Sequence, residues 1–150
     1  MNIKDIFNAD VVTCAQDTSI YEVAALMRTL HVGDVIVVDA DEPPRPIGIV
    51  TDRDLVVELI AGDVDFDTVS AGDVMSWELL TIDIEAEVTE ALQCMRVNGI
   101  RRLPVVDAQG ALAGVVSVED IAQWLAACVA DLITISSNER DVEARKLKSA

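Results

Sequence analysis

The chain has 150 residues, a net charge of −16 and a hydrophobic content of 51%, with a mean hydropathy of +0.35. This apolar content predicts a folded core and excludes a disordered chain. The surplus of acid repels the phosphates of nucleic acids and anionic lipids, so we expect neither nucleic acid nor membrane as a partner. The longest uncharged apolar stretch, residues 121–130, is too short to cross a bilayer.

The first residues and the cysteines indicate a cytoplasmic protein. Residues 1–5 lack the basic start and apolar segment of a secretion signal. Cys14, Cys94 and Cys128 are odd in number and lie within apolar patterns, so we expect buried free thiols in a reducing compartment. The cysteines have no C-x-x-C spacing and the chain has 1 histidine, so no metal site is predicted.

The first half of the chain alternates between strand and helix patterns. The run at 35–38 is β-branched, which favours a buried strand. Ser19 and Glu22 have capping-box spacing, which predicts the start of a helix. The predicted order is strand, helix, strand, strand, helix, at residues 11–13, 21–30, 35–38, 46–51 and 52–61.

The same order of elements recurs in the second half. Asp39 superposes on Asp107 and Met27 on Met95, a shift of 68 in both cases, and after a longer turn in the first copy the shift becomes 66. The second copy predicts strand, helix, strand, strand, helix at residues 79–82, 87–98, 103–107, 111–117 and 118–131. A repeat of this length present only twice is not a solenoid. It predicts two halves around a pseudo-two-fold axis, with paired clefts between them.

We therefore expect an α/β (α+β) fold of two β-α-β-β-α repeats packed through their sheets. The first repeat with its approach segment covers residues 1–61, a polar linker covers 62–74, and the second repeat covers 75–131. The charged tail, residues 132–150, is expected to be solvated rather than a defined element. Trp77 and Trp124 are expected to be packing residues.

Two short motifs carry the candidate chemistry. They cover residues 48–54 and 114–120, and in each a hydroxyl residue is followed three places later by aspartate. The pairs are Thr51 with Asp54 and Ser117 with Asp120. Helix capping is enough to explain one such pair. However, a helix N-terminus also suits a phosphate, and a carboxylate can accept hydrogen bonds from the hydroxyls of a ribose. The repetition of the pair therefore favours two related ligand sites.

These motifs resemble those of tandem cystathionine-β-synthase domains, a CBS pair or Bateman module. The resemblance covers about residues 5–130 and rests on Gly48-Ile49-Val50-Thr51-Asp52-Arg53-Asp54, Gly114-Val115-Val116-Ser117-Val118-Glu119-Asp120 and Ile100-Arg101-Arg102-Leu103-Pro104-Val105-Val106-Asp107. The family implies two clefts for adenosyl ligands: AMP, ADP, ATP or S-adenosylmethionine. It also implies that the aspartate holds the ribose, that the hydroxyl residue lies by the ribose or α-phosphate, and that apolar residues sandwich the adenine.

Carried over to this chain, the resemblance implies a first cleft that we favour for a nucleotide. Its polar residues would be Thr51, Arg53, Asp54, Arg101 and Arg102, with Arg53 and Arg101 as the preferred phosphate partners. Its adenine wall would be Ile49, Leu80 and Ile100, with residues 75–76 nearby.

The second cleft would use Ser117 and Asp120, with walls of Val12, Val32 and Val115. Here the sequence departs from the family pattern, because Gly33 and Asp34 stand where the second repeat has Arg101 and Arg102, and Glu119 replaces Arg53. A carboxylate near a phosphate is unfavourable by roughly 1 kcal/mol. The second cleft is therefore better suited to an uncharged or cationic adenosyl ligand.

The resemblance implies a regulatory module that senses adenine nucleotides, with output through a homodimer or an unknown effector protein. No nucleophile with an orienting base is found, so no enzyme is predicted. No cofactor is required, and the resemblance allows Mg²⁺ together with ATP without requiring it. Two alternatives remain open: a module that binds S-adenosylmethionine, and a dimerisation scaffold that binds no ligand.

Overall fold

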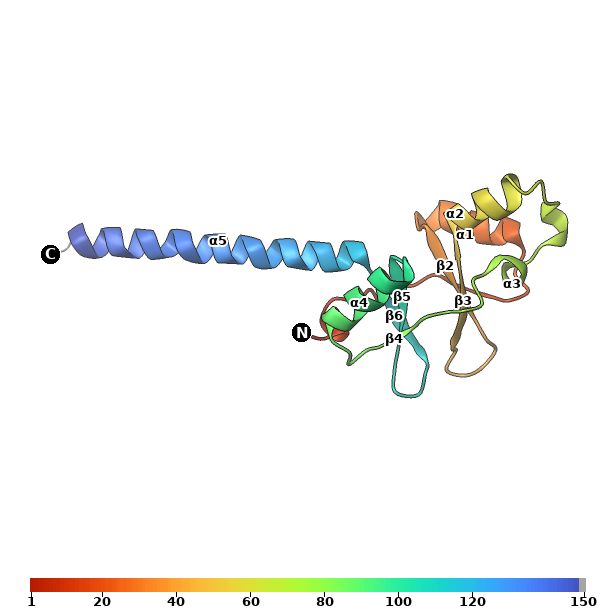
Figure 1. Ribbon diagram of the computed structural model, residues 1–150, viewed down its shortest axis with the longest axis horizontal. Helices are drawn as coiled ribbons and strands as arrows, with labels where there is room; N and C mark the ends of the chain where they lie inside the picture. The colour runs from red at the N-terminus through yellow and green to blue at the C-terminus, as the bar shows by residue number, and fades with distance from the viewer. Residues whose placement is uncertain (149–150) are drawn as a thin grey trace.

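The structure is a computed structural model that describes the backbone of residues 1–148 and the side chains of residues 1–135. It confirms the predicted α/β fold, with two three-stranded sheets in the orders β1-β2-β3 and β4-β5-β6 (Figure 1). The first repeat has β1 (Thr13–Ala15), α1 (Ile20–Leu30), β2 (Asp34–Val38), β3 (Pro46–Thr51), α2 (Asp52–Asp54) and the π-helix η2 (Leu55–Ile60). The second has β4 (Ile82–Asp83), α4 (Val88–Asn98), β5 (Arg102–Val106), β6 (Leu112–Ser117) and α5 (Val118–Lys148). Short helices η1 (Ile3–Asp5), η3 (Phe66–Thr68) and α3 (Ala71–Val74) lie before and between the repeats.

The two sheets have the same internal pairing. In the first, β1 is parallel to β2 and β2 is antiparallel to β3, and β4, β5 and β6 repeat this arrangement. The helices α1 and α4 supply the crossover that each parallel pair requires. The register shifts between Val37 and Val38 and again between Val105 and Val106, positions that are 68 residues apart. The repeat seen in the sequence is therefore also a repeat of strand register.

Each repeat completes its core with a segment from outside its own strands and helices. We call residues 3–8 and 71–76 the approach segments. Ile3 is fully buried in the core of the second repeat, whereas Ala71 is fully buried in the core of the first. The backbone N–H of Ile3 donates to the Ala86 carbonyl at 2.9 Å, and the N–H of Ala71 donates to the Thr18 carbonyl at 2.8 Å. The predicted linker, residues 62–74, is therefore part of the folded core at its C-terminal end.

The approach segments pack closely on one glycine in each sheet. A Cβ built on Gly48 would lie 2.7 Å from Met75 Cγ, and one on Gly114 would lie 2.7 Å from Phe7 Cε2. The backbone bonds next to these contacts are also equivalent, since Ser76 N–H donates to the Ile49 carbonyl at 3.0 Å and Asn8 N–H donates to the Val115 carbonyl at 2.8 Å. Glycine is required at both positions because a neighbouring segment occupies the space of a side chain.

The first strand of each repeat and the second helix of the first repeat differ from the prediction. The first strand of each repeat begins two or three residues later than predicted, at Thr13 and Ile82, because pairing with the next strand sets the boundary. The predicted helix 52–61 is one α-helical turn followed by a π-helix, in which Ala61 N–H donates to the Val56 carbonyl at 3.0 Å. Trp124 packs on the second core as predicted, but Trp77 is 65% exposed and is not a packing residue.

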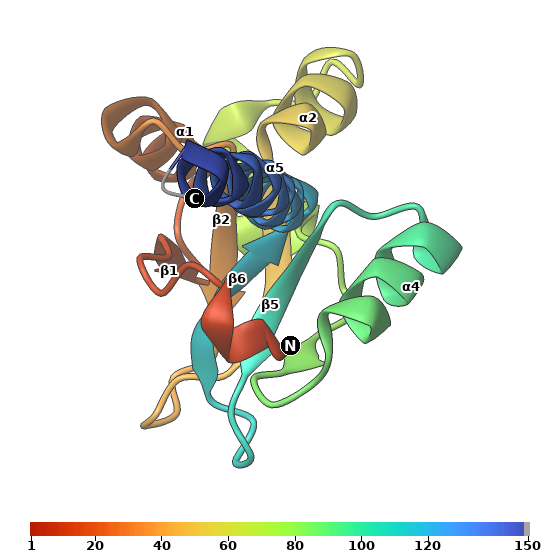
Figure 2. The same cartoon turned by 90° about the vertical axis from the view of Figure 1, so that its left-hand side faces the viewer.

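The last helix is much longer than predicted. α5 continues past residue 131 to Lys148 and extends away from the two sheets (Figure 1), and Figure 2 shows it nearly end-on. The expectation that the tail forms no defined element was wrong for residues 132–148, because residues 118–148 contain neither glycine nor proline to end the helix. No helix in the part of the chain that the structure describes is long and apolar enough to cross a membrane.

Candidate functional site

The two repeats have equivalent strand-to-helix junctions, and each junction forms a reciprocal cap. In the first repeat, the backbone N–H and Oγ1 of Thr51 donate to Asp54 Oδ2 at 2.8 and 2.7 Å. In return, the N–H of Asp54 donates to Thr51 Oγ1 at 3.2 Å. The capping role predicted from the spacing is therefore confirmed. This cap involves one carboxylate oxygen of Asp54, and the other makes no hydrogen bond within the part of the chain that the structure describes in full.

The first predicted site is a real cavity of about 340 Å³ between the two repeats. It lies where β3 ends and where the chain leads from α4 into β5. Its lining residues are Ile49, Thr51, Asp52, Arg53, Asp54, Ser76, Gly99, Ile100, Arg101 and Arg102. The structure thus brings together seven of the eight residues predicted for this cleft, and Leu80 is not among the lining residues. Binding of a ligand by them remains a prediction.

Sequence reasoning missed Asp52 and Gly99 as lining residues. Gly99 ends α4 with φ of 66° and ψ of 26°, a left-handed conformation that glycine adopts without strain. A glycine at this position is a typical helix end and can be recognised in the sequence. That Gly99 lines a cavity cannot, because the opposite wall of the cavity comes from the other repeat. Asp52 brings a carboxylate to the same wall, so the cavity contains acidic as well as basic groups.

Both arginines from the second repeat are already paired with carboxylates. Arg102 Nε lies 2.8 Å from Asp34 Oδ1, and this pair joins the two repeats. Arg101 pairs with Glu119. The side chains of Asp34 and Arg102 are 15% and 35% exposed, whereas those of Arg101 and Glu119 are 71% and 54% exposed. The Arg102 pair is therefore better shielded from solvent, and the Arg101 pair is a weak surface contact.

The pKa values of the two paired carboxylates are shifted in opposite directions. Burial raises the pKa of Asp34, while Arg102 opposes this increase and the charges of Asp52 and Asp120 add to it. For Glu119, the hydrogen bond from Arg101 lowers the pKa. Asp34 therefore lies near other carboxylates of both repeats, and Arg102 is the cation that compensates for its charge.

The residues predicted for the second cleft repeat the cap but not the basic surroundings. Ser117 N–H and Oγ donate to Asp120 Oδ2 at 2.8 and 2.5 Å, and Asp120 N–H donates to Ser117 Oγ at 3.1 Å. Val12 and Val32 pack on the first core, and Val115 is half-buried and pairs with the first approach segment. That these side chains form one ligand cavity remains a prediction.

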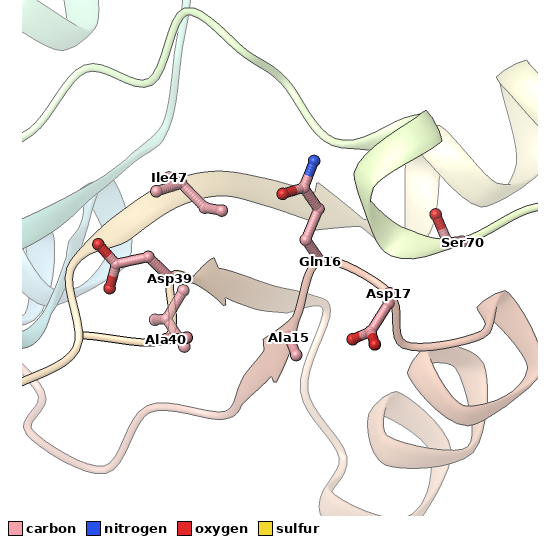
Figure 3. A pocket seen from close by; sticks show the side chains of 8 residues that line it. Ala15, Gln16, Asp17, Asp39, Ala40, Ile47 and Ser70 are labelled. Carbon is pink, nitrogen blue, oxygen red and sulfur yellow. The ribbon is translucent and has the colours of Figure 1, made fainter. Parts of the chain in front are cut away.

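A different cavity of about 550 Å³ lies at the other end of the first sheet (Figure 3). Its lining residues are Ala15, Gln16, Asp17, Val38, Asp39, Ala40, Ile47 and Ser70. Asp39 Oδ1 accepts hydrogen bonds from the backbone N–H groups of Asp41 at 3.3 Å and Arg45 at 2.8 Å, so this carboxylate holds the β2–β3 turn. The lining contains two carboxylates and no lysine or arginine, and it is therefore unsuited to a phosphate.

The cysteines and potential metal ligands are dispersed. Cys14 is buried and free, and Cys94 and Cys128 are half-buried and free. Burial raises the pKa of the Cys14 thiol, as expected for a thiol that serves in packing. Among the residues that the structure describes, no group of three or more histidine, cysteine, aspartate or glutamate side chains is placed to hold a metal ion.

Comparison with known proteins identifies the same family in both halves of the chain. A family model for the CBS domain matches residues 3–61 and 71–127. The chain is 38% identical over 123 residues to an uncharacterized protein of Methanopyrus kandleri, a match that covers 82% of this chain and 62% of that protein. It is 31% identical over 122 residues to hypoxic response protein 1 of Mycobacterium tuberculosis, covering 81% of this chain and 83% of that protein.

Solved structures show the same fold. The structure of Hypoxic Response Protein I with two coordinated zinc ions has a TM-score of 0.71 at 29% identity, covering 82% of this chain and 98% of that one. A CBS domain protein of Pyrobaculum aerophilum complexed with AMP has a TM-score of 0.73 at 28% identity, covering 80% of this chain and 89% of that one.

Proposed function

Because the chain belongs to the CBS domain family, as its motifs predicted, we propose that it is a regulatory module that binds an adenine nucleotide in the cavity at Thr51–Asp54. One observation carries this proposal. The chain has 11 lysines and arginines against 27 acids, yet Arg53, Arg101 and Arg102 line one cavity. Three arginines outnumber the two carboxylates of the same lining, Asp52 and Asp54, and this local excess of cations opposes the overall field of the protein, so it favours an anionic ligand.

The cavity offers a partner for each part of a nucleotide. The arginines can hold the phosphates with charge-assisted hydrogen bonds. The Asp54 oxygen that the cap leaves unused can accept from the ribose hydroxyls. Ile49 and Ile100 provide apolar surface from the two repeats for the adenine. The volume of about 340 Å³ is in the range of small-molecule sites. The AMP complex of the P. aerophilum relative supports the choice of an adenine nucleotide.

We infer that the response is a change in the arrangement of the two repeats. Thr51 and Asp54 come from the first repeat, whereas Arg101 and Arg102 come from the second, so a nucleotide held by both would bridge them. A ligand shifts such an equilibrium only if it binds one arrangement more tightly than the other. The output would pass to a second copy or to an effector protein. The module is regulatory and not catalytic in this proposal, and Mg²⁺ would accompany ATP alone.

A second candidate ligand, S-adenosylmethionine, is favoured by the acidic groups around the second predicted cleft. Asp34, Glu119 and Asp120 place carboxylates on that side of the inter-repeat boundary. A cationic ligand would gain from these charges, whereas a polyphosphate would be repelled. The two ligands would therefore prefer different clefts.

Matched variants of the two caps test the proposal by calorimetric titration with AMP, ADP, ATP and S-adenosylmethionine. Asp54→Ala and Asp120→Ala remove the same kind of cap, and each should cost about 1 kcal/mol of stability. We expect Asp54→Ala to weaken nucleotide binding at least ~10-fold and Asp120→Ala to leave it nearly unchanged. Equal losses would place the site elsewhere, and no binding of any of the four compounds would favour a ligand-free scaffold. Trp77, which follows the cavity residue Ser76, provides a fluorescence signal for the same titrations.

A further inference from the structure

The two predicted clefts have charges of opposite sign at equivalent positions of the repeat. Arg102 of the second repeat lines the nucleotide cavity, and the shift of 68 residues places Asp34 at the same position of the first repeat. Arg53 also lines this cavity, and the shift of 66 residues places Glu119 at its position in the second repeat. Two cations of the first cleft therefore correspond to two anions of the second.

Two ion pairs connect the cations of the first cleft with these anions. Arg102 Nε lies 2.8 Å from Asp34 Oδ1, and Arg101 pairs with Glu119. Asp34 also lies close enough to Asp120, the ribose residue expected in the second cleft, for the two carboxylates to repel each other. In each pair, an arginine of the first cleft is therefore held by a carboxylate that the second cleft would otherwise offer to a ligand.

A phosphate in the first cleft would disturb the better shielded of these pairs. It competes with Asp34 for Arg102, and the two side chains are 15% and 35% exposed. When Arg102 turns to the phosphate, Asp34 stays largely buried near Asp52 and Asp120 and loses its cation. A buried carboxylate without a partner is unfavourable, so this state favours a positive charge in the second cleft.

We propose that the two clefts are coupled, so that an anionic nucleotide in the first strengthens the binding of a cationic adenosyl compound, S-adenosylmethionine, in the second. The coupling rests on the proposed function, because it requires a nucleotide in the first cleft. The nucleotide takes Arg102, and the cationic ligand compensates the charge of Asp34 in its place. Each ligand then tightens the binding of the other by the same factor, since coupling between two sites is reciprocal. The module therefore responds to two compounds together.

The size of the coupling follows from one charge. A cation beside Asp34 offsets the carboxylate that repels the phosphate, so the dissociation constant of the nucleotide should fall about 5- to 10-fold. Asp34→Asn removes the same charge by substitution. This variant should therefore bind the nucleotide without the second ligand about as tightly as the wild type binds it with that ligand.

Calorimetric titration of the full chain with AMP, with and without saturating S-adenosylmethionine, tests the coupling. S-adenosylhomocysteine is the matched control ligand, because it keeps the adenosyl and amino-acid groups but lacks the charged sulfonium. We expect S-adenosylmethionine to lower the dissociation constant of AMP about 5- to 10-fold and S-adenosylhomocysteine to change it less than ~2-fold. The reverse titration, with AMP saturating, should give the same factor for S-adenosylmethionine.

Two variants test whether the ion pairs carry the coupling. Asp34→Asn should reduce the factor to less than ~2-fold. Glu119→Gln should reduce it less, because the side chain of Glu119 is 54% exposed and its pair is screened by solvent. A coupling that is unchanged in Asp34→Asn would overturn the proposal.

The titrations separate failure of the coupling from failure of the proposed function. Affinities that do not depend on the other ligand would overturn the coupling alone. Weaker binding of each ligand in the presence of the other would also overturn it, because that result indicates competition for one cleft. Binding of AMP without any binding of S-adenosylmethionine would have the same consequence. Absence of AMP binding to the wild type would overturn the proposed nucleotide site together with the coupling.

Discussion

Replacing Asp34 with asparagine should tighten nucleotide binding, although Asp34 does not line the cavity. Asp34 Oδ1 lies 2.8 Å from Arg102 Nε and is largely buried, so in the unliganded protein it neutralises one of the three cavity arginines. A phosphate must compete with this carboxylate for Arg102. The Asp34→Asn variant keeps the shape of the side chain and removes the competing charge.

The expected gain follows from the charges that change. The Asp34 carboxylate and a phosphate bound at Arg102 would repel each other. Two unit charges roughly 10 Å apart, at an effective dielectric constant of about 30, interact by about 1 kcal/mol. Removal of the Asp34 charge should therefore lower the nucleotide dissociation constant about 5- to 10-fold. The gain should be larger for ATP than for AMP, because ATP has more negative charge, and smaller at high salt.

Calorimetric titration of both nucleotides at two salt concentrations measures this effect. Glu119→Gln is the internal comparison, because Glu119 holds Arg101 in a pair that is mostly exposed and should therefore matter less. Unchanged or weaker nucleotide binding in Asp34→Asn would refute the reasoning. It would show that Asp34 positions Arg102 for the phosphate rather than competing for it.

Two further predictions concern stability. Gly48→Ala and Gly114→Ala should each lower the free energy of unfolding by about 1–3 kcal/mol, because the new methyl group meets Met75 or Phe7. Urea unfolding measures this free energy. Wild-type stability in both variants would contradict the close packing. Burial raises the pKa of Asp34 above its ordinary value of 3.8, so the folded protein holds this proton more tightly than the unfolded chain does. The stabilising contribution of that proton is full below the unfolded pKa and is lost as the pH rises through the folded pKa. Wild type should therefore gain stability relative to Asp34→Asn as the pH falls toward about 4, and a difference that does not change with pH would count against this.

The parts of the site that sequence reasoning recovered are those set by local spacing. The two residues of each cap, Thr51–Asp54 and Ser117–Asp120, are three positions apart in one segment, so the geometry of the cap follows from the residue types. The order of strands and helices along the chain followed from the internal repeat, and seven of the eight residues expected at the first cavity followed from the family resemblance. In contrast, the pairing of Arg102 with Asp34 joins residues 68 positions apart, and no local pattern indicates which carboxylate an arginine will meet.

The errors also have physical causes. Residues 71–74 read as a polar linker because Gly72 and Asp73 hide the burial of Ala71, which depends on contacts with the other side of the first repeat. The helix after Thr51 was recognised, but its π-helical winding was not, because hydrogen bonds over four and over five residues require similar sequences. The sequence prediction ends α5 too early because charged residues near a chain terminus are typical of a solvated tail, whereas the absence of a helix breaker allows the helix to continue.

The exchange of approach segments has a consequence for how the protein is made. The first repeat lacks a buried core residue, Ala71, until the chain has been synthesised well past η2, and the second repeat takes its buried Ile3 from the residues synthesised first. Neither half is a complete folding unit, so the N-terminus must wait for most of the chain before it can dock. A backbone cut between residues 62 and 69 would therefore leave two fragments that each contain part of the other's core, and such fragments should recover a folded protein only when they are mixed.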